Sequence, residues 1–223
     1  MPIVLCNGGP GYGDYLSPIA PMISDLARVI RWEPRGCGKS DIAGPYDLAT
    51  TLADLDDLRS KLGFDSWIVG GHSHGAFLAL AYALQYPRHV NGIIYICGTG
   101  IQNDRSWSEA YHRGKDEGRE LEFADAYPPN LEVNRVGNAS ARDFCRGSRI
   151  LRRIADLDPP LFAVQAGADI RPNWPVEQLV ELMPNASLTV IPGASHNVWL
   201  THPTELQDIL RRTVMSFTGK ISE

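Results

Sequence analysis

Short runs of apolar residues alternate with helical patterns almost from the start of the chain. The first run ends in a glycine-rich turn at residues 7–11, and the second is followed by a loop at residues 34–38. Runs of this length bounded by turn-forming residues are typical of buried strands. They predict six strands, at residues 3–6, 28–32, 67–69, 92–97, 161–165 and 188–191.

The segments between these runs carry helical periodicity. Leucines recur at three- and four-residue spacing across residues 47–62, and Gly63 follows where a helix prefers to end. Further helices are predicted at residues 76–85, 176–183 and 204–217. Strands and helices that alternate with short connections predict an α/β fold, with a mostly parallel sheet of about six strands covered by helices on both faces.

The alternation lapses between the fourth and fifth predicted strands. This stretch is charged, with a predicted helix at 106–126, a turn at 128–130 and a basic segment at 142–153. We interpret residues 99–157 as a cap or lid inserted into a single domain that spans residues 1–223.

Composition narrows the classes of protein without naming one. The chain has 223 residues, with 21 Lys and Arg against 26 Asp and Glu, and no basic tract that would bind a phosphate backbone. Its four cysteines are scattered, with no Cys-x-x-Cys pair, and no segment has the character of a signal peptide or of a membrane span. We therefore expect a cytoplasmic protein without nucleic acid, membrane, metal or cofactor as a partner.

The strongest chemical signal is a serine between two glycines. Gly71, Ser73 and Gly75 form a Gly-x-Ser-x-Gly pattern, with an apolar strand before it and a helix after it. A tight strand-to-helix turn places such a serine in a strained conformation and exposes its hydroxyl above the sheet. Ser73 is therefore our candidate nucleophile.

A serine nucleophile needs a base, and the base needs a carboxylate that orients it. Asp169 and His196 follow the last two predicted strands, so they are expected at the same edge of the sheet as Ser73. The order Ser, Asp, His along the chain is that of the α/β-hydrolases. We assign His196 as the general base and Asp169 as its orienting acid.

The anionic intermediate of acyl transfer needs preorganised N–H donors, each contributing roughly 3–4 kcal/mol. The backbone N–H of His74, next to Ser73, is one candidate for this oxyanion hole. The second is expected in the turn after the first strand, with Gly9 preferred over Gly8 and Asn7 holding the turn in place.

Three segments together resemble the proline iminopeptidases. The loop Asn7-Gly8-Gly9-Pro10-Gly11 is similar to their His-Gly-Gly-Pro-Gly loop, and residues 33–40 (Glu-Pro-Arg-Gly-Cys-Gly-Lys-Ser) resemble their Asp-x-Arg-Gly-x-Gly-x-Ser loop. The nucleophile region, residues 70–82, is also similar. With the Asp169 and His196 loops, the similarity covers nearly all of the chain outside 99–157 and implies the α/β-hydrolase fold.

Some positions depart from that family's pattern. Asn7 replaces the usual His, His74 stands where the family commonly has Trp, and Glu33 replaces an Asp. The family's cap carries glutamates that bind the substrate's free amine. Their candidates in this shorter insertion are Glu109, Glu117, Glu120 and Glu122, for which a solvated helix face is the simpler interpretation.

The resemblance also bears on assembly. The chain begins at what is normally the third strand of the fold, which implies that two leading strands are missing and that residues 28–32 lie at a sheet edge. An apolar edge favours self-association unless another segment covers it. We therefore expect either a homo-oligomer or a covering segment.

These observations predict a serine hydrolase that acts on a small molecule or a short peptide. A proline iminopeptidase-like aminopeptidase is the first hypothesis. A carboxylesterase or a carbon–carbon bond hydrolase acting on a small apolar substrate is the second. The third is a ligand-binding protein that keeps the triad but has little turnover.

Overall fold

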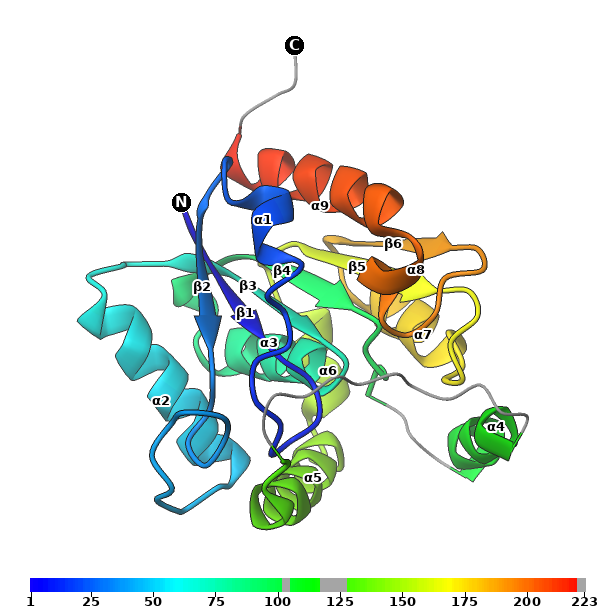
Figure 1. Ribbon diagram of the computed structural model, residues 1–223, viewed down its shortest axis with the longest axis horizontal. Helices are drawn as coiled ribbons and strands as arrows, with labels where there is room; N and C mark the ends of the chain where they lie inside the picture. The colour runs from blue at the N-terminus through cyan, green and yellow to red at the C-terminus, as the bar shows by residue number, and fades with distance from the viewer. Residues whose placement is uncertain (102–104, 117–127, 220–223) are drawn as a thin grey trace.

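One parallel sheet forms the centre of the molecule (Figure 1). The structure, a computed structural model, describes residues 1–101, 105–116 and 128–219. The sheet has six strands in the order β2-β1-β3-β4-β5-β6, and every adjacent pair is parallel. The strands are β1 (Pro2–Cys6), β2 (Arg28–Trp32), β3 (Trp67–His72), β4 (Val90–Ile96), β5 (Leu161–Ala166) and β6 (Ala186–Ile191). The predicted fold class is confirmed.

Because the strands are parallel, their carboxyl ends meet at one edge of the sheet. The loops that follow β1, β3, β5 and β6 therefore gather in one region. The first strand lies between β2 and β3, and residues 28–32 form an edge strand as expected. Self-association across that edge stays a prediction.

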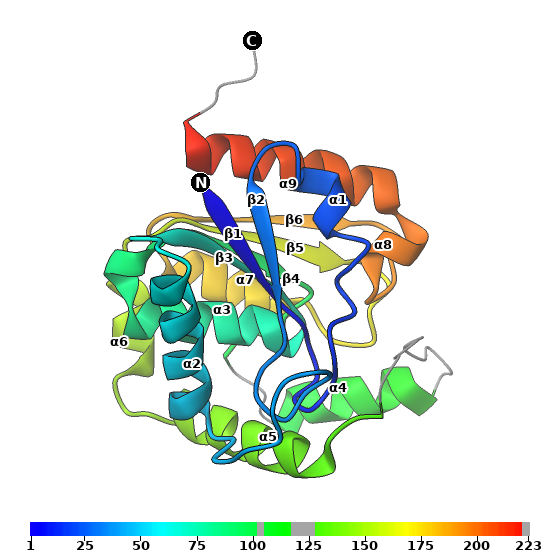
Figure 2. The same cartoon turned by 60° about the vertical axis from the view of Figure 1, so that its left-hand side comes forward.

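Helices cover both faces of the sheet (Figures 1 and 2). One face packs against α1 (Ala20–Ile23), α8 (Val198–Thr201) and α9 (Pro203–Thr218). The other packs against α2 (Leu48–Lys61), α3 (His74–Gln85), α6 (Ile150–Ala155) and α7 (Trp174–Leu182), and the short 3-10 helix η1 (Pro87–His89) precedes β4. The four helices predicted outside the insertion are all present, with ends that lie within two residues of those expected.

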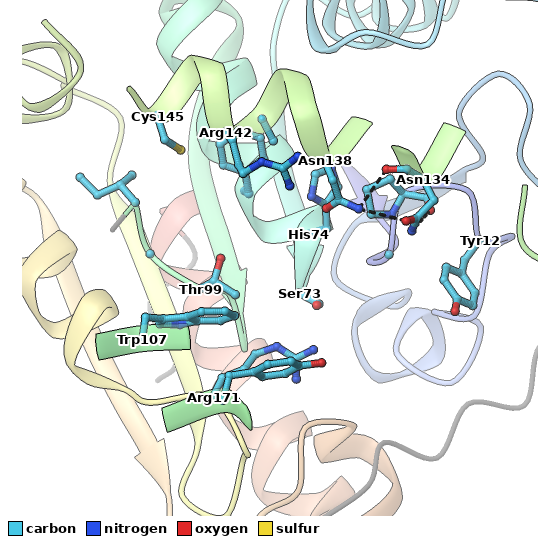
Figure 3. Close-up of a pocket in the computed structure, with 17 residues that line it drawn as sticks. Tyr12, Ser73, His74, Thr99, Trp107, Asn134, Asn138, Arg142, Cys145 and Arg171 are labelled. Atoms are coloured by element: carbon cyan, nitrogen blue, oxygen red, sulfur yellow. Dashed lines mark hydrogen bonds between the residues drawn. The ribbon is translucent and has the colours of Figure 1, made fainter. Parts of the chain in front are cut away.

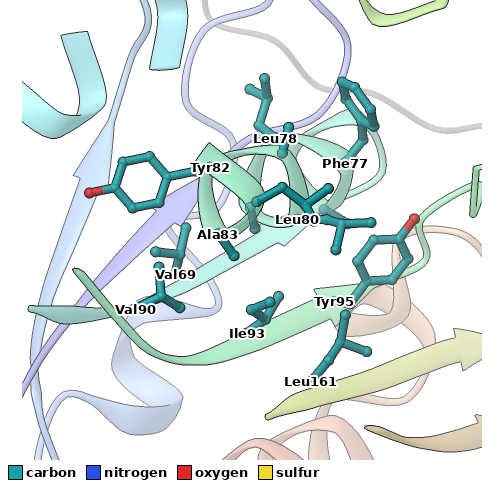
Figure 4. Close-up of a cluster of buried hydrophobic side chains, with 14 of the residues drawn as sticks. Val69, Phe77, Leu78, Leu80, Tyr82, Ala83, Val90, Ile93, Tyr95 and Leu161 are labelled. Atoms are coloured by element: carbon teal, nitrogen blue, oxygen red, sulfur yellow. The ribbon is translucent and has the colours of Figure 1, made fainter. Parts of the chain in front are cut away.

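The larger core cluster lies under α3 (Figure 4). All residues of this helix from Gly75 to Leu84 are buried, so it runs through the middle of the molecule. Tyr82 of this helix is fully buried, as are Trp67 of β3 and Ile93 and Tyr95 of β4. Burying each such side chain contributes about 1.5–3 kcal/mol or more, so this cluster fixes the helix that begins directly after Ser73.

The segment between β4 and β5 contains α4 (Arg105–Asp116), α5 (Leu131–Cys145) and α6. The helix expected at 106–126 is confirmed up to Asp116, and the remainder lies outside the described residues. The helices α5 and α6 were not predicted, and the basic segment at 142–153 includes the end of α5 and most of α6. The helix α5 contains Asn134, Gly137 and Asn138, which are weak helix formers and obscured its pattern.

Two features of the surroundings stabilise α5. The side chain of Asn130 accepts hydrogen bonds from the backbone N–H groups of Glu132 and Val133, which caps the helix. The Asn134 amide donates to the Pro10 carbonyl at 2.8 Å, and the Leu48 N–H donates to Ser140 Oγ at 3.0 Å. These contacts fix α5 above the carboxyl ends of the strands. In the described part of the chain, no helix is both long enough and apolar enough to cross a membrane.

Candidate active site

Ser73 lies in the sharp turn between β3 and α3. Its backbone has φ 57° and ψ −121°, a strained conformation for a residue with a side chain, and its N–H donates to the Ile96 carbonyl at 2.9 Å. A Cβ on Gly71 would collide with the Gly75 backbone, and one on Gly75 would collide with the Cys6 carbonyl. Both glycines are therefore required by close packing, as the sequence pattern predicts.

Asp169 and His196 meet at the ends of β5 and β6. The Ala168 N–H donates to the Ala194 carbonyl at 2.9 Å and joins the two loops. His196 Nδ1 lies 2.5 Å from Asp169 Oδ2, and both side chains are almost completely buried. The His196 ring packs against that of His72, the residue before Ser73, with 4.4 Å between ring centroids.

The second ring nitrogen of His196 is the unusual atom of this cluster. A buried carboxylate on Nδ1 fixes the tautomer of a neutral imidazole so that Nδ1 carries the hydrogen. Nε2 then presents a lone pair. Nε2 is buried and has no hydrogen-bond partner among the described residues. Buried polar atoms are normally paired, so an unpaired basic nitrogen at this place is a functional signal.

The ionisation of the pair follows from its surroundings. Burial lowers the pKa of His196 from its ordinary value of 6.5, the positive charge of Arg171 lowers it further, and the bond to Asp169 opposes both effects. Burial alone would raise the pKa of Asp169, but the contacts with His196 and Arg171 outweigh it and the pKa is lowered. At neutral pH the pair is thus a neutral imidazole beside a carboxylate.

A chain of hydrogen bonds ties three loops together behind Ser73. His72 Nε2 lies 2.9 Å from the His196 carbonyl, which only accepts, so His72 Nε2 is a donor. His72 Nδ1 must then accept from the Tyr15 hydroxyl at 2.8 Å, and Tyr15 Oη accepts the Gly8 N–H at 2.7 Å. This network fixes the loop after β1, the serine turn and the His196 loop relative to one another.

The two glycines of the loop after β1 both lie near Ser73, but their surroundings differ. The Gly8 N–H is engaged by Tyr15, whereas Gly9 lines the cavity above Ser73 together with His74. The Asn7 amide donates to the carbonyls of Tyr12 and Gly13 at 3.0 and 3.1 Å, which holds the loop in place. The choice of Gly9 over Gly8 as a candidate oxyanion donor therefore gains support from this geometry.

His72, Cys97 and His196 place their ligand atoms within 4.8 Å of one another. Both nitrogens of His72 and one of His196 are already hydrogen-bonded. Burial also raises the pKa of the Cys97 thiol, so it stays protonated, whereas metals bind the thiolate. This cluster is therefore not preorganised to bind a metal ion.

A cavity of about 410 Å³ opens directly above Ser73 (Figure 3). Figure 3 shows Asn134, Asn138 and Arg142 on one side of Ser73 and Trp107 and Arg171 on the other. Volumes of this size accommodate small ligands. The lining residues are Gly9, Pro10, Tyr12, Ser73, His74, Phe77, Thr99, Gly100, Ile101, Trp107, Tyr111, Asn134, Asn138, Ala141, Arg142, Cys145 and Arg171.

The proposed amine-binding glutamates are not part of this lining in the described residues. Glu109 is exposed on α4, and the residues of that helix that line the cavity are Trp107 and Tyr111. Glu117, Glu120 and Glu122 lie outside the described residues.

Several residues of the site were missed by sequence reasoning. Arg171 lies two positions after Asp169, and its guanidinium donates to Asp169 Oδ1 at 3.2 Å, so proximity in the same loop was a usable signal. Tyr15 is 57 positions from His72, and nothing in the sequence indicates that contact. Arg142 and Asn138 belong to a helix that was itself not predicted.

Comparisons with known proteins agree with this geometry. The model of the α/β hydrolase fold family matches residues 1–133. A proline iminopeptidase of Saccharolobus solfataricus is 37% identical over 101 residues, which is 43% of this chain and 33% of that protein. A proline iminopeptidase of Arabidopsis thaliana is 34% identical over 188 residues, covering 75% of this chain and 49% of that protein.

Solved structures show the same fold. A malate-bound thermophilic esterase from Thermogutta terrifontis superposes with a TM-score of 0.78 at 20% identity, over 97% of this chain and 90% of that one. The chain spans about a third of the length of the first curated relatives it matches. The sheet, the serine turn and the family match over residues 1–133 show together that the chain belongs to the α/β hydrolase fold family.

Proposed function

We propose that the protein is a serine hydrolase in which Ser73 is the nucleophile, His196 the general base and Asp169 the acid that orients it. One observation carries this proposal. His196 is held by Asp169 through Nδ1, while its buried Nε2 has no partner among the described residues. The His196 ring packs against His72, the residue before Ser73, and Ser73 is strained at the floor of a cavity. A nucleophile needs a base of this kind within reach.

The reaction follows from these groups. His196 Nε2 takes the hydroxyl proton as Ser73 Oγ attacks the substrate carbonyl, and the N–H groups of Gly9 and His74 stabilise the oxyanion. Asp169 stabilises the imidazolium, which then protonates the leaving alcohol or amine. A water molecule, activated by the same nitrogen, attacks the acyl-enzyme, and collapse of the second intermediate releases the acid and restores Ser73.

The substrate lies under the insertion in this proposal. Residues of α4 and α5 roof the cavity, so we assign residues 99–157 the role of a cap that selects the substrate. The described lining offers aromatic and amide side chains and no carboxylate for an ammonium group. A buried ammonium without a paired carboxylate costs several kcal/mol, which favours an esterase-like activity.

An aminopeptidase of the proline iminopeptidase type is the second candidate. The observation in its favour is the similarity to curated proline iminopeptidases, including 34% identity over 188 residues to the protein from Arabidopsis thaliana.

A substrate panel separates the two candidates. We expect 4-nitrophenyl butyrate to be hydrolysed by the wild type and not by Ser73→Ala, because attack by Ser73 is required. We expect prolyl-naphthylamide to react more slowly than the ester, with little effect of N-acetylation. The measurement is kcat/KM for each compound, with Ser187→Ala, an exposed serine on β6, as the matched control. A strong preference for the free prolyl compound over its acetylated form would contradict the esterase assignment and support the aminopeptidase.

The pH dependence tests the electrostatics around His196. The His196 ring faces Asp169, Arg171, His72 and Cys97. Burial keeps His72 and Cys97 uncharged at neutral pH. The charges that act on the ring are therefore those of Asp169 and Arg171. Because the base must be neutral, kcat/KM should rise with pH through a midpoint below 6.5. Loss of the Arg171 charge removes a cause of the lowered pKa, so Arg171→Gln should move the midpoint to higher pH.

Arg171→Lys keeps the charge and is the matched control for this shift. Its midpoint should stay closer to that of the wild type when both variants are assayed on a neutral ester. An equal shift in both variants, or a shift to lower pH in Arg171→Gln, would contradict the electrostatic role of Arg171.

A further inference from the structure

The charges that line the cavity are all of one sign in the described part of the chain. Arg142 of α5 and Arg171 of the loop after β5 both line it, and no Asp or Glu does. Burial lowers the pKa of His74, the one histidine of the lining, to about 4, so it is neutral at pH 7. The two arginines lie on opposite sides of Ser73 in Figure 3.

Arg142 differs from three other arginines of the insertion, which pair with carboxylates. Arg135 pairs with Glu132 at 2.8 Å, Arg146 with Asp143 at 4.0 Å and Arg152 with Asp156 at 2.8 Å. Among the described residues, no carboxylate or hydrogen-bond acceptor is paired with the guanidinium of Arg142, although Asp143 is its neighbour in sequence. Its donors are therefore available at the cavity wall.

Arg171 is fixed by two contacts that leave several of its N–H donors without an acceptor among the described residues. Among the residues that the structure describes, its side chain makes one hydrogen bond, to Asp169 Oδ1, and its guanidinium lies 5.4 Å from the centroid of the Tyr111 ring. These contacts leave most of its five N–H groups unused. Asp169 itself is buried behind Arg171 and is shared with His196, so it does not present a negative charge to the cavity.

A guanidinium with unused donors matches a carboxylate, which it binds through two parallel hydrogen bonds. We propose that the substrate is an ester or amide that carries a carboxylate near the scissile bond, and that Arg142 binds this group with Arg171 as a second cation. This inference rests on the proposed hydrolase function and specifies its substrate class. It also predicts that a free ammonium group is repelled from the cavity.

Two matched pairs of esters test the proposal and locate the carboxylate. In the first pair, monomethyl adipate is anionic and dimethyl adipate is neutral, and the charge lies on the acyl side. In the second pair, 4-(butyryloxy)benzoate is anionic and its methyl ester is neutral, and the charge lies on the leaving group. For each pair the readout is the ratio of kcat/KM for the anionic ester to that for the neutral ester, so differences in overall activity between variants cancel.

We expect the anionic ester to be preferred in at least one pair, with a ratio that decreases as salt concentration rises. Arg142→Ala should lower that ratio about tenfold to a hundredfold, the range for a lost hydrogen-bonded ion contact. Arg142→Lys should retain part of it. Arg142 and Arg146 are both exposed, but of the two only Arg142 lines the cavity. Arg146→Ala is therefore the matched control, since it removes the same charge outside the cavity, and it should leave the ratio within about twofold.

The outcomes separate the two proposals. Hydrolysis of the neutral esters without any anionic preference, and with the same ratio in Arg142→Ala, overturns the substrate class but leaves the hydrolase function intact. An equal decrease in Arg146→Ala and Arg142→Ala also overturns it, because net charge alone would then account for the preference. Failure to hydrolyse any of the four esters, together with no reaction of Ser73 with a fluorophosphonate, overturns the proposed function and this inference with it.

Discussion

Ser73→Ala and His196→Ala should each lower kcat by about 10³-fold or more on any ester that the wild type hydrolyses. In the proposed mechanism the nucleophile and the base act as one unit, because Ser73 is a weak nucleophile until His196 Nε2 accepts its proton. Removing either group removes the same covalent step. The double variant should therefore be little slower than either single variant, and the measurement is kcat for all three proteins.

Folding must be checked in the same experiment. The buried His196 ring packs against His72, and His72 also packs against Trp199. A large-to-small change in this cluster therefore lowers the free energy of unfolding. His196→Gln is a second variant that fills more of the space, and it should show the same loss of kcat with a smaller effect on thermal unfolding. Losses that multiply in the double variant, or near-normal turnover in Ser73→Ala, would contradict the shared step.

Asp169→Asn should lower kcat by about 10³- to 10⁴-fold while leaving the fold intact. An amide that presents its NH₂ group to His196 Nδ1 makes that nitrogen an acceptor and moves the ring hydrogen to Nε2. The base then has no lone pair directed at Ser73. The lowered pKa of Asp169 shows that the carboxylate is the form that the site stabilises, so the neutral amide loses that interaction.

Asp158→Asn provides the matched control, because Asp158 is exposed and precedes the amino end of β5, whereas Asp169 follows its carboxyl end. It should retain near-normal kcat. A decrease of less than about tenfold in Asp169→Asn would mean that His196 is oriented by another group, such as the contact with His72. A similar decrease in Asp158→Asn would mean that the effect is not local.

The sheet could be predicted from the sequence because each strand is a compact apolar run. The strand β3 is longer than expected, since it continues through Gly70, Gly71 and His72, which carry no apolar signal. Pairing with β4 and close packing of α3 place those residues in the sheet. The serine turn could also be predicted, because the Gly-x-Ser-x-Gly pattern between a strand and a helix is local. The collision that excludes a side chain at Gly75 is with the Cys6 carbonyl, which is distant in the sequence.

The walls of the cavity could not be predicted in the same way. The helix α5 depends on a cap at Asn130 and on contacts with Pro10 and Leu48, which are distant in the sequence. Arg142 lines the cavity because these contacts place α5 above it. The cavity wall that we propose selects the substrate therefore depends on tertiary contacts, whereas the candidate nucleophile, acid and base follow from local patterns at the ends of strands.

Reaction with a fluorophosphonate, located by mass spectrometry, tests the central claim most directly. We expect one adduct per chain, on the peptide that contains Ser73, with no adduct in Ser73→Ala and a much slower reaction in His196→Ala. A folded wild-type protein that forms no adduct, or one that is modified equally at another serine, would contradict the assignment of Ser73 as an activated nucleophile.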